Sequence, residues 1–172
     1  MDLPFEILDR TQFADEGYGI LGRALAFGTD FEANCRACAS IIGLKSQPEI
    51  LIDEKSINEF CRFIFKRGLH VQIQTLENKL KLPEDVSSLL SKGRESRNYL
   101  AHEAGLGLRH ILENNERREN FINDIKAKVS DIAEANLIIL FLTNIVTNEP
   151  NPTLESLKKY VGNIIEWVCE VE

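Results

Sequence analysis

Arg94, Asn98 and His102 follow one another at intervals of four residues, and Arg97 lies beside them. Residues four apart are neighbours on the surface of a helix, so these side chains can act on one ligand. An arginine guanidinium presents a fixed fork of donors that fits a phosphate, and histidine takes or gives a proton near neutral pH. The asparagine amide can orient a ribose oxygen or the imidazole. Together they are the groups that phosphodiester cleavage needs.

The helix expected to carry these residues begins at Pro83 and runs to about residue 114 or 115. Proline suits the first turn of a helix, and the acids that follow it suit the positive end of the helix dipole. Polar residues share one stripe of this helix, within roughly 80° of one another on the wheel: Ser91, Arg94, Asn98, His102 and Arg109. The opposite face is apolar or small and is predicted to pack in the core: Val86, Leu89, Gly93, Leu100, Ala104, Gly107 and Ile111. Arg97 lies at the border, where its stem can rest on the bundle while its guanidinium reaches the stripe.

The stretch from Arg94 to His102, R-E-S-R-N-Y-L-A-H, resembles the signature of HEPN domains. That signature is an arginine followed by a polar residue and then, a few positions on, by a histidine. The resemblance implies a helical bundle with metal-independent ribonuclease activity, often found in toxins and defence nucleases. It assigns Arg97 and His102 to catalysis and Asn98 to their support, whereas Arg94 and Arg109 are candidate substrate-binding residues from their place on the stripe.

In that family two copies dimerise so that their motifs face each other across one composite site. We therefore expect RNA as substrate, a homodimer, and a cognate antitoxin or defence protein as a further partner. Attack by the ribose 2′-hydroxyl would leave a 2′,3′-cyclic phosphate without a metal or cofactor. The toxins that pair with a nucleotidyltransferase antitoxin carry a modified tyrosine two residues after the histidine. Ala104 stands at that position here, which argues against this mode of regulation.

Other readings of the same residues stay open. The stripe could bind a nucleotide or dock a protein without chemistry, or the chain could serve as a structural or antitoxin subunit. Arg94 could form an ion pair, and Arg109 and His110 could be solvated or cap the helix end. Lys66, Arg67 and His70 form a second basic patch, which either extends an RNA groove or is only a charged turn around Gly68. The acidic residues Asp30 and Glu32 could supply a partner to His102.

Apolar residues at spacings of three and four predict four further helices, over about 15–44, 54–80, 116–147 and 153–171. Gly68 could bend or break the second of them. Ile50, Leu51 and Ile52 are expected to form a loop, because a lone short strand has no partner. Short connections between long helices predict a single all-α domain over residues 1–172, an up-and-down antiparallel bundle of about five helices.

The chain has 172 residues, of which 44% are apolar and 27% charged, typical of a globular protein. A formal charge of −7 argues against broad phosphate-backbone binding, so any nucleic-acid site must be local. The first residues do not resemble a secretory signal, and the apolar run from Ala135 to Val146 is shorter than the roughly 20 residues of a membrane span. We expect a cytoplasmic protein in which Cys35 and Cys38 are reduced and pack between helices.

Overall fold

The structure is a computed structural model that describes residues 12–106, 108, 111 and 114–170. The described part is all-helical and contains no strand. Its α-helices are α1 (Gln12–Lys45), α2 (Glu54–Phe65), α3 (Leu69–Leu80), α4 (Glu84–His102), α6 (Asn115–Thr147) and α7 (Leu154–Cys169). The segment expected to be a loop forms a short 3-10 helix, η2 (Pro48–Ile52). The all-α bundle predicted from the sequence is therefore confirmed.

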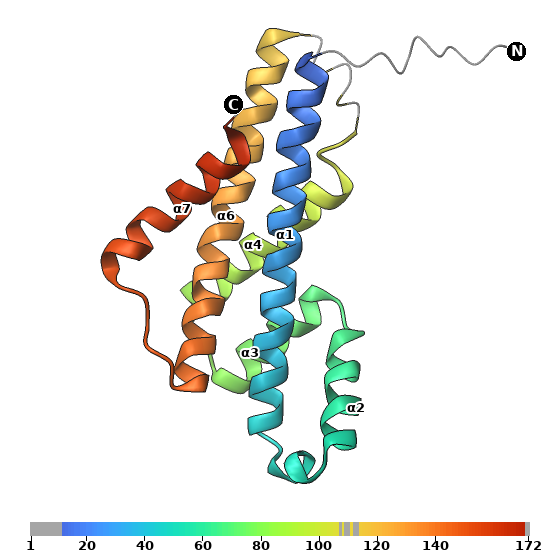
Figure 1. The fold of residues 1–172 in the computed structure, drawn as a ribbon, viewed down its shortest axis with the longest axis vertical. Coiled ribbons are helices and arrows are strands. Elements are labelled where there is room, and N and C mark those ends of the chain that lie inside the picture. The colour runs from blue at the N-terminus through green and yellow to red at the C-terminus, as the bar shows by residue number, and fades with distance from the viewer. Residues whose placement is uncertain (1–11, 107, 109–110, 112–113, 171–172) are drawn as a thin grey trace, which may run out of the picture.

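The two longest helices, α1 and α6, lie side by side along the length of the molecule (Figure 1). Helix α4 crosses behind them and packs on both, α7 leans against α6, and α2 and α3 pack on α1. The buried side chains form one core, whose largest fully enclosed members come from all of the long helices: Phe31, Ile20, Leu76, Leu90, Ile125 and Ile132. This core fixes α4 on three neighbouring helices.

Consecutive helices alternate in direction. Phe65 lies near Arg36 and Phe60 near Gly43, so α2 runs antiparallel to α1. Helix α3 then turns back, α4 reverses again, and α6 descends beside α1 (Figure 1). Asn34 of α1 donates to Asn136 of α6 at 3.0 Å, and Lys45 at the carboxyl end of α1 donates to the carbonyl oxygen of Val146 at the carboxyl end of α6. These two contacts show that α1 and α6 run in the same direction. The long central pair is therefore parallel, although its sequence neighbours are antiparallel.

This parallel pair follows from a break that the sequence left undecided. The segment predicted as one helix over 54–80 is two helices, separated by Lys66, Arg67 and Gly68. Gly68 has an extended backbone and directly precedes the first residue of α3. The buried Gln72 amide donates to the carbonyl oxygen of Arg67 at 2.8 Å and fixes the turn. Each reversal of the chain changes the direction of every later helix. The additional reversal between α2 and α3 therefore makes α6 parallel to α1.

The third predicted helix is shorter than expected. We predicted that it reaches residue 114 or 115, but α4 ends at His102 and a turn follows. The backbone N–H groups of Glu103 and Ala104 both donate to the carbonyl oxygen of Tyr99, which closes the last turn. Gly105 and a second glycine two residues later explain the end physically, because each costs a helix about 1 kcal/mol relative to alanine.

The predicted apolar face of this helix was correct only in part. Gly93, Leu100 and Ala104 are buried, whereas Leu89 is 36% exposed and its neighbour Leu90 is fully buried. Val86 and Ile111 are only partly buried, and Gly107 lies outside the described residues. The wheel assumed one continuous straight helix, and α4 instead inclines across two partners (Figure 1). Its buried face is centred on Leu90, Gly93 and Leu100.

Helix α6 is long and apolar enough, by length and composition alone, to cross a membrane, and no other helix of the described residues passes that test. In the described structure α1, α4 and α7 all contact it. The thiols of Cys35 and Cys38 are free and fully buried in the same core. They pack in the core, as predicted, and burial raises the pKa of both.

Candidate functional site

The polar stripe lies on the exposed side of α4. Asn98 and His102 are exposed, and Arg94 and Arg97 are half-buried, each with 24% of its side chain exposed. Arg94, Asn98 and His102 belong to one unbroken helix, so the predicted four-residue ladder exists as drawn on the wheel. The prediction that Arg94, Asn98 and His102 share one polar face of a helix is therefore confirmed.

Arg97 is held by the first helix. Its guanidinium Nη2 donates to Oε2 of Glu32, whose other carboxylate oxygen lies 3.0 Å from the guanidinium of Arg36. The stem of Arg97 rests on Gly28, at a point where an added Cβ would come within 3.4 Å of its Cγ. Nη1 also lies 3.5 Å from Oδ1 of Asn98, at the limit of a hydrogen bond. Arg97 thus borders the stripe as predicted, with its charge directed by a carboxylate.

Arg94 links the stripe to the start of α3. Its Nη1 donates to Nδ1 of His70 at 3.0 Å, and its Nη2 lies 3.3 Å from a carboxylate oxygen of Glu95. The ion pair considered for this arginine thus exists, with Glu95 as its partner. His70 belongs to the second basic patch of the sequence, so the fold joins two patches that the sequence presents separately.

His102 is the last residue of α4, and its imidazole makes no hydrogen bond or ion pair with any described residue. The carboxylate of Glu32, which we considered as its partner, binds Arg97 and Arg36 instead. Asp30 is exposed. Nothing within the described chain therefore orients the imidazole.

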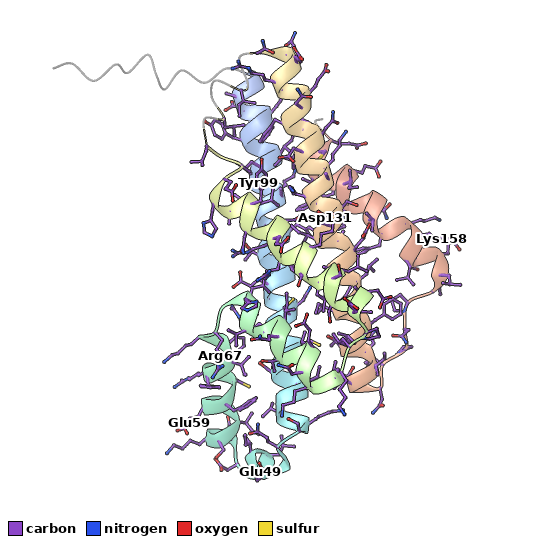
Figure 2. All side chains as sticks on the ribbon, turned by 180° about the vertical axis from the view of Figure 1, so that it is seen from behind. Glu49, Glu59, Arg67, Tyr99, Asp131 and Lys158 are labelled. Carbon is purple, nitrogen blue, oxygen red and sulfur yellow. The ribbon has the colours of Figure 1, made fainter. Side chains whose placement is uncertain are left out.

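The side of α4 opposite the stripe is fixed to α6. The buried Ser96 hydroxyl donates to Asp131 at 2.7 Å, and the Lys92 ammonium binds the other oxygen of the same carboxylate at 2.8 Å. Tyr99 also points away from the stripe, packs against the core, and lies on the upper half of α4 in Figure 2. A hydrogen bond to Asp124, reinforced by burial, raises the pKa of Tyr99 to about 12. These contacts set the rotation of α4 and hence the direction of the stripe.

Arg109, the second candidate substrate-binding residue, lies outside the described residues, as does His110. Its predicted place on the stripe assumed that the helix continues beyond His102, and that assumption is wrong. A cavity of about 310 Å³ adjoins the end of α4, but Tyr99, Glu103 and residues of α6 line it. None of Arg94, Arg97, Asn98 and His102 lines this cavity. Among the described residues, no three His, Cys, Asp or Glu side chains lie close enough together to hold a metal ion.

Two contributors to the site were not identified from the sequence. Arg36 had no assigned role, and His70 was placed in a separate patch. Glu32 and Arg36 are spaced as an i, i+4 pair on a helix, which predicts their ion pair but not its contact with Arg97. Contacts between residues 65 positions apart arise only when α4 packs on α1.

No protein-family model, no curated protein and no solved structure matches the chain.

Proposed function

We propose that this protein is a metal-independent endoribonuclease of the HEPN type, with Arg97 and His102 as its catalytic residues. The observation that carries the proposal is the ladder of Arg94, Asn98 and His102 on the exposed face of α4, bordered by Arg97. A phosphate donor, an amide and a proton carrier are thereby within reach of one nucleotide. The all-α bundle agrees with the fold that this family uses.

The proposed reaction is a transesterification within the RNA chain. His102 accepts the proton of the ribose 2′-hydroxyl, and the 2′ oxygen forms a bond to phosphorus. The bond between phosphorus and the 5′ oxygen breaks, and that oxygen receives a proton from a second histidine in its imidazolium form, which becomes a neutral imidazole. Arg97 donates to the phosphorane oxygens as their negative charge grows, while Asn98 holds the nucleotide. The products are a 2′,3′-cyclic phosphate and a 5′-hydroxyl, and the substrate supplies its own nucleophile.

Glu32 can hold Arg97 and still leave it able to bind a phosphate, because a guanidinium has five N–H donors. One is used by Glu32 and another is shared weakly with Asn98, which leaves donors of Arg97 for a phosphate. A carboxylate that fixes the plane of the guanidinium lowers the entropy lost when substrate binds. In this proposal Glu32 is a positioning residue, and Arg97 touches the substrate.

The reaction needs a base and an acid, and each chain offers one histidine on the stripe. We propose that a second copy supplies the other imidazole, with the two α4 faces opposed across the RNA. The exposed position of His102 at the end of α4 supports this arrangement. Static light scattering at micromolar concentration should give twice the chain mass, and a monomer would argue against the shared site.

A non-catalytic binding module is the second candidate, and one observation favours it. Arg97 is engaged by Glu32, and the imidazole of His102 makes no hydrogen bond or ion pair with a described residue, so the reacting groups are not assembled within one chain. The same stripe could then bind a nucleotide or a protein, in a toxin–antitoxin or defence setting, without cutting anything.

Incubation of purified protein with mixed RNA in EDTA separates the two candidates. We expect the parent to cut RNA to 2′,3′-cyclic phosphate ends and to leave DNA of the same sequence intact. His102→Ala and Arg97→Ala should each lose at least 100-fold in rate, as expected for general acid–base and charge-stabilising groups at about 10²- to 10⁴-fold each. Lys158→Ala, an exposed change on α7, serves as the control (Figure 2). Equal background from all four proteins would favour the binding module.

A further inference from the structure

We propose that the end of α2, the turn to α3 and the adjoining part of α4 form a binding surface for single-stranded nucleic acid beside Arg97. We call it the α2–α3 surface and define it by Phe63, Phe65, Arg67, His70 and Arg94. The proposal deepens the ribonuclease function and rests on it for the choice of ligand. In this proposal bases stack on the two rings and phosphates bind the cations.

Charge sets this segment apart from the rest of the chain. Between Glu59 and Glu77 there are three Lys or Arg residues and one His, with no carboxylate, in a protein whose formal charge is −7. Single-stranded nucleic acid binds where a local positive groove follows its phosphates. The local positive charge complements such a ligand, whereas the overall charge excludes broad binding.

Two aromatic rings are exposed in the same segment of the chain. Phe63 is 52% exposed and Phe65 is 49% exposed, both near the end of α2. The guanidinium carbon of Arg67 lies 4.0 Å from the centre of the Phe63 ring, and that of Arg36 lies 5.4 Å from the centre of the Phe65 ring. An exposed ring with a guanidinium beside it provides a flat stacking surface and donors for a phosphate.

Contacts connect this surface to the candidate catalytic residues. From Phe65 the path runs through Arg36 and Glu32 to Arg97. A second path runs from His70 to Arg94 at 3.0 Å, one helical turn from Asn98. Arg67 stands where α2 meets α3, at the edge of the molecule opposite Lys158 (Figure 2). A strand bound at Arg67 and His70 can therefore continue past Arg94 to the stripe on α4.

The turn that carries the α2–α3 surface is also held in place before any ligand binds. Gln72, 1% exposed, donates to the carbonyl oxygen of Arg67 at 2.8 Å. The neighbouring Ile64 and Leu69 are buried and anchor the two sides of the turn in the core. Because the backbone is fixed, little order has to be gained when a strand binds.

The probe for the test is a fluorescent single-stranded DNA of 12 nucleotides, which stacks like RNA but lacks the 2′-hydroxyl and is not cut. Fluorescence anisotropy should show binding by the parent, and a blunt duplex of the same length should bind more weakly. Phe63→Leu with Phe65→Leu should weaken binding about five- to 150-fold for each base whose stacking is lost. Phe63→Trp with Phe65→Trp should retain it, since tryptophan also stacks.

Trp167→Leu is the matched control, because it removes an aromatic ring that is 53% exposed on α7. It should bind the probe as the parent does, and melting curves of all variants should show that they are folded. Arg67→Gln should reduce the slope of log affinity against log salt by about 0.7, the value of one single-strand phosphate contact. Equal binding by the leucine variant and the parent would overturn the proposal, as would a parent that does not bind the probe. If the surface instead docks another protein, the parent would not bind the probe.

The two proposals fail in different ways. If the parent cuts RNA and the leucine variant cuts it with the same kcat/KM, the nuclease stands and the α2–α3 surface is wrong. If the probe binds through the phenylalanines but RNA survives, the surface stands and the catalytic role is wrong.

Discussion

Gly93 determines how closely α4 can approach α6, and its replacement by alanine tests the packing that aims the stripe. A Cβ at this position would lie 2.3 Å from Cβ of Ala135, 3.3 Å from the carbonyl oxygen of Asp131 and 3.4 Å from Cζ of Phe31. The Cβ of Ala135 is fixed to its backbone and cannot rotate away. Accommodating the added methyl group therefore requires the two helices to move apart.

The magnitude is a balance of two terms. Overpacking a filled core costs about 1–3 kcal/mol, and the contact at Ala135 is far inside normal van der Waals distance, so we take about 3 kcal/mol. Removing a glycine from a helix interior returns about 1 kcal/mol. The expected net loss is about 2 kcal/mol of unfolding free energy, and about 4–8 °C in Tm for a domain of this size.

Gly22→Ala is the control, because Gly22 lies within α1 and an added Cβ meets nothing within 4 Å. That variant should gain up to about 1 kcal/mol and melt about 2–4 °C higher than the parent. Thermal unfolding followed by circular dichroism measures both changes. If Gly93→Ala melts at or above the parent temperature, the close approach of α4 to α6 is not as described, and the predicted direction of the stripe is unsupported.

Three further predictions concern the interior. Tyr160→Phe removes the hydroxyl that accepts a hydrogen bond from the buried Asn136 amide at 2.7 Å. Urea unfolding should show that the free energy of unfolding falls by about 1–3 kcal/mol. A change below about 0.3 kcal/mol would contradict this hydrogen bond. Absorbance titration should show that Tyr99 ionises near pH 12. Because this pKa lies above the ordinary value of 10, the contribution of Tyr99 to the free energy of unfolding is complete below about pH 10 and is lost as the pH rises through 12. Ionisation at pH 10 would refute the hydrogen bond to Asp124. Iodoacetamide should leave Cys35 and Cys38 unmodified in the native protein, as mass spectrometry can check, whereas rapid labelling would show that they are accessible.

Much of the local structure was predictable because its causes lie within a few residues. The periodicity of apolar residues gave α1 and α6 nearly to their ends, and the caps Asn114 and Thr153 accept from backbone N–H groups as such residues do. The four-residue ladder on α4 likewise depends only on helix geometry. Its assumed extension beyond His102 was wrong because the helical wheel ignores the cost of Gly105 and of the glycine two residues later.

The motif from Arg94 to His102 was thus visible in the sequence, since residue type and spacing alone place these side chains on one face. What surrounds it was decided only by tertiary packing. The break at Gly68 reverses the chain, which makes α6 parallel to α1 and brings α4 across both helices. That crossing places Glu32 against Arg97 and His70 against Arg94. Helix periodicity repeats every few residues and carries no information on which distant helix will be the neighbour, so these partners required the folded chain.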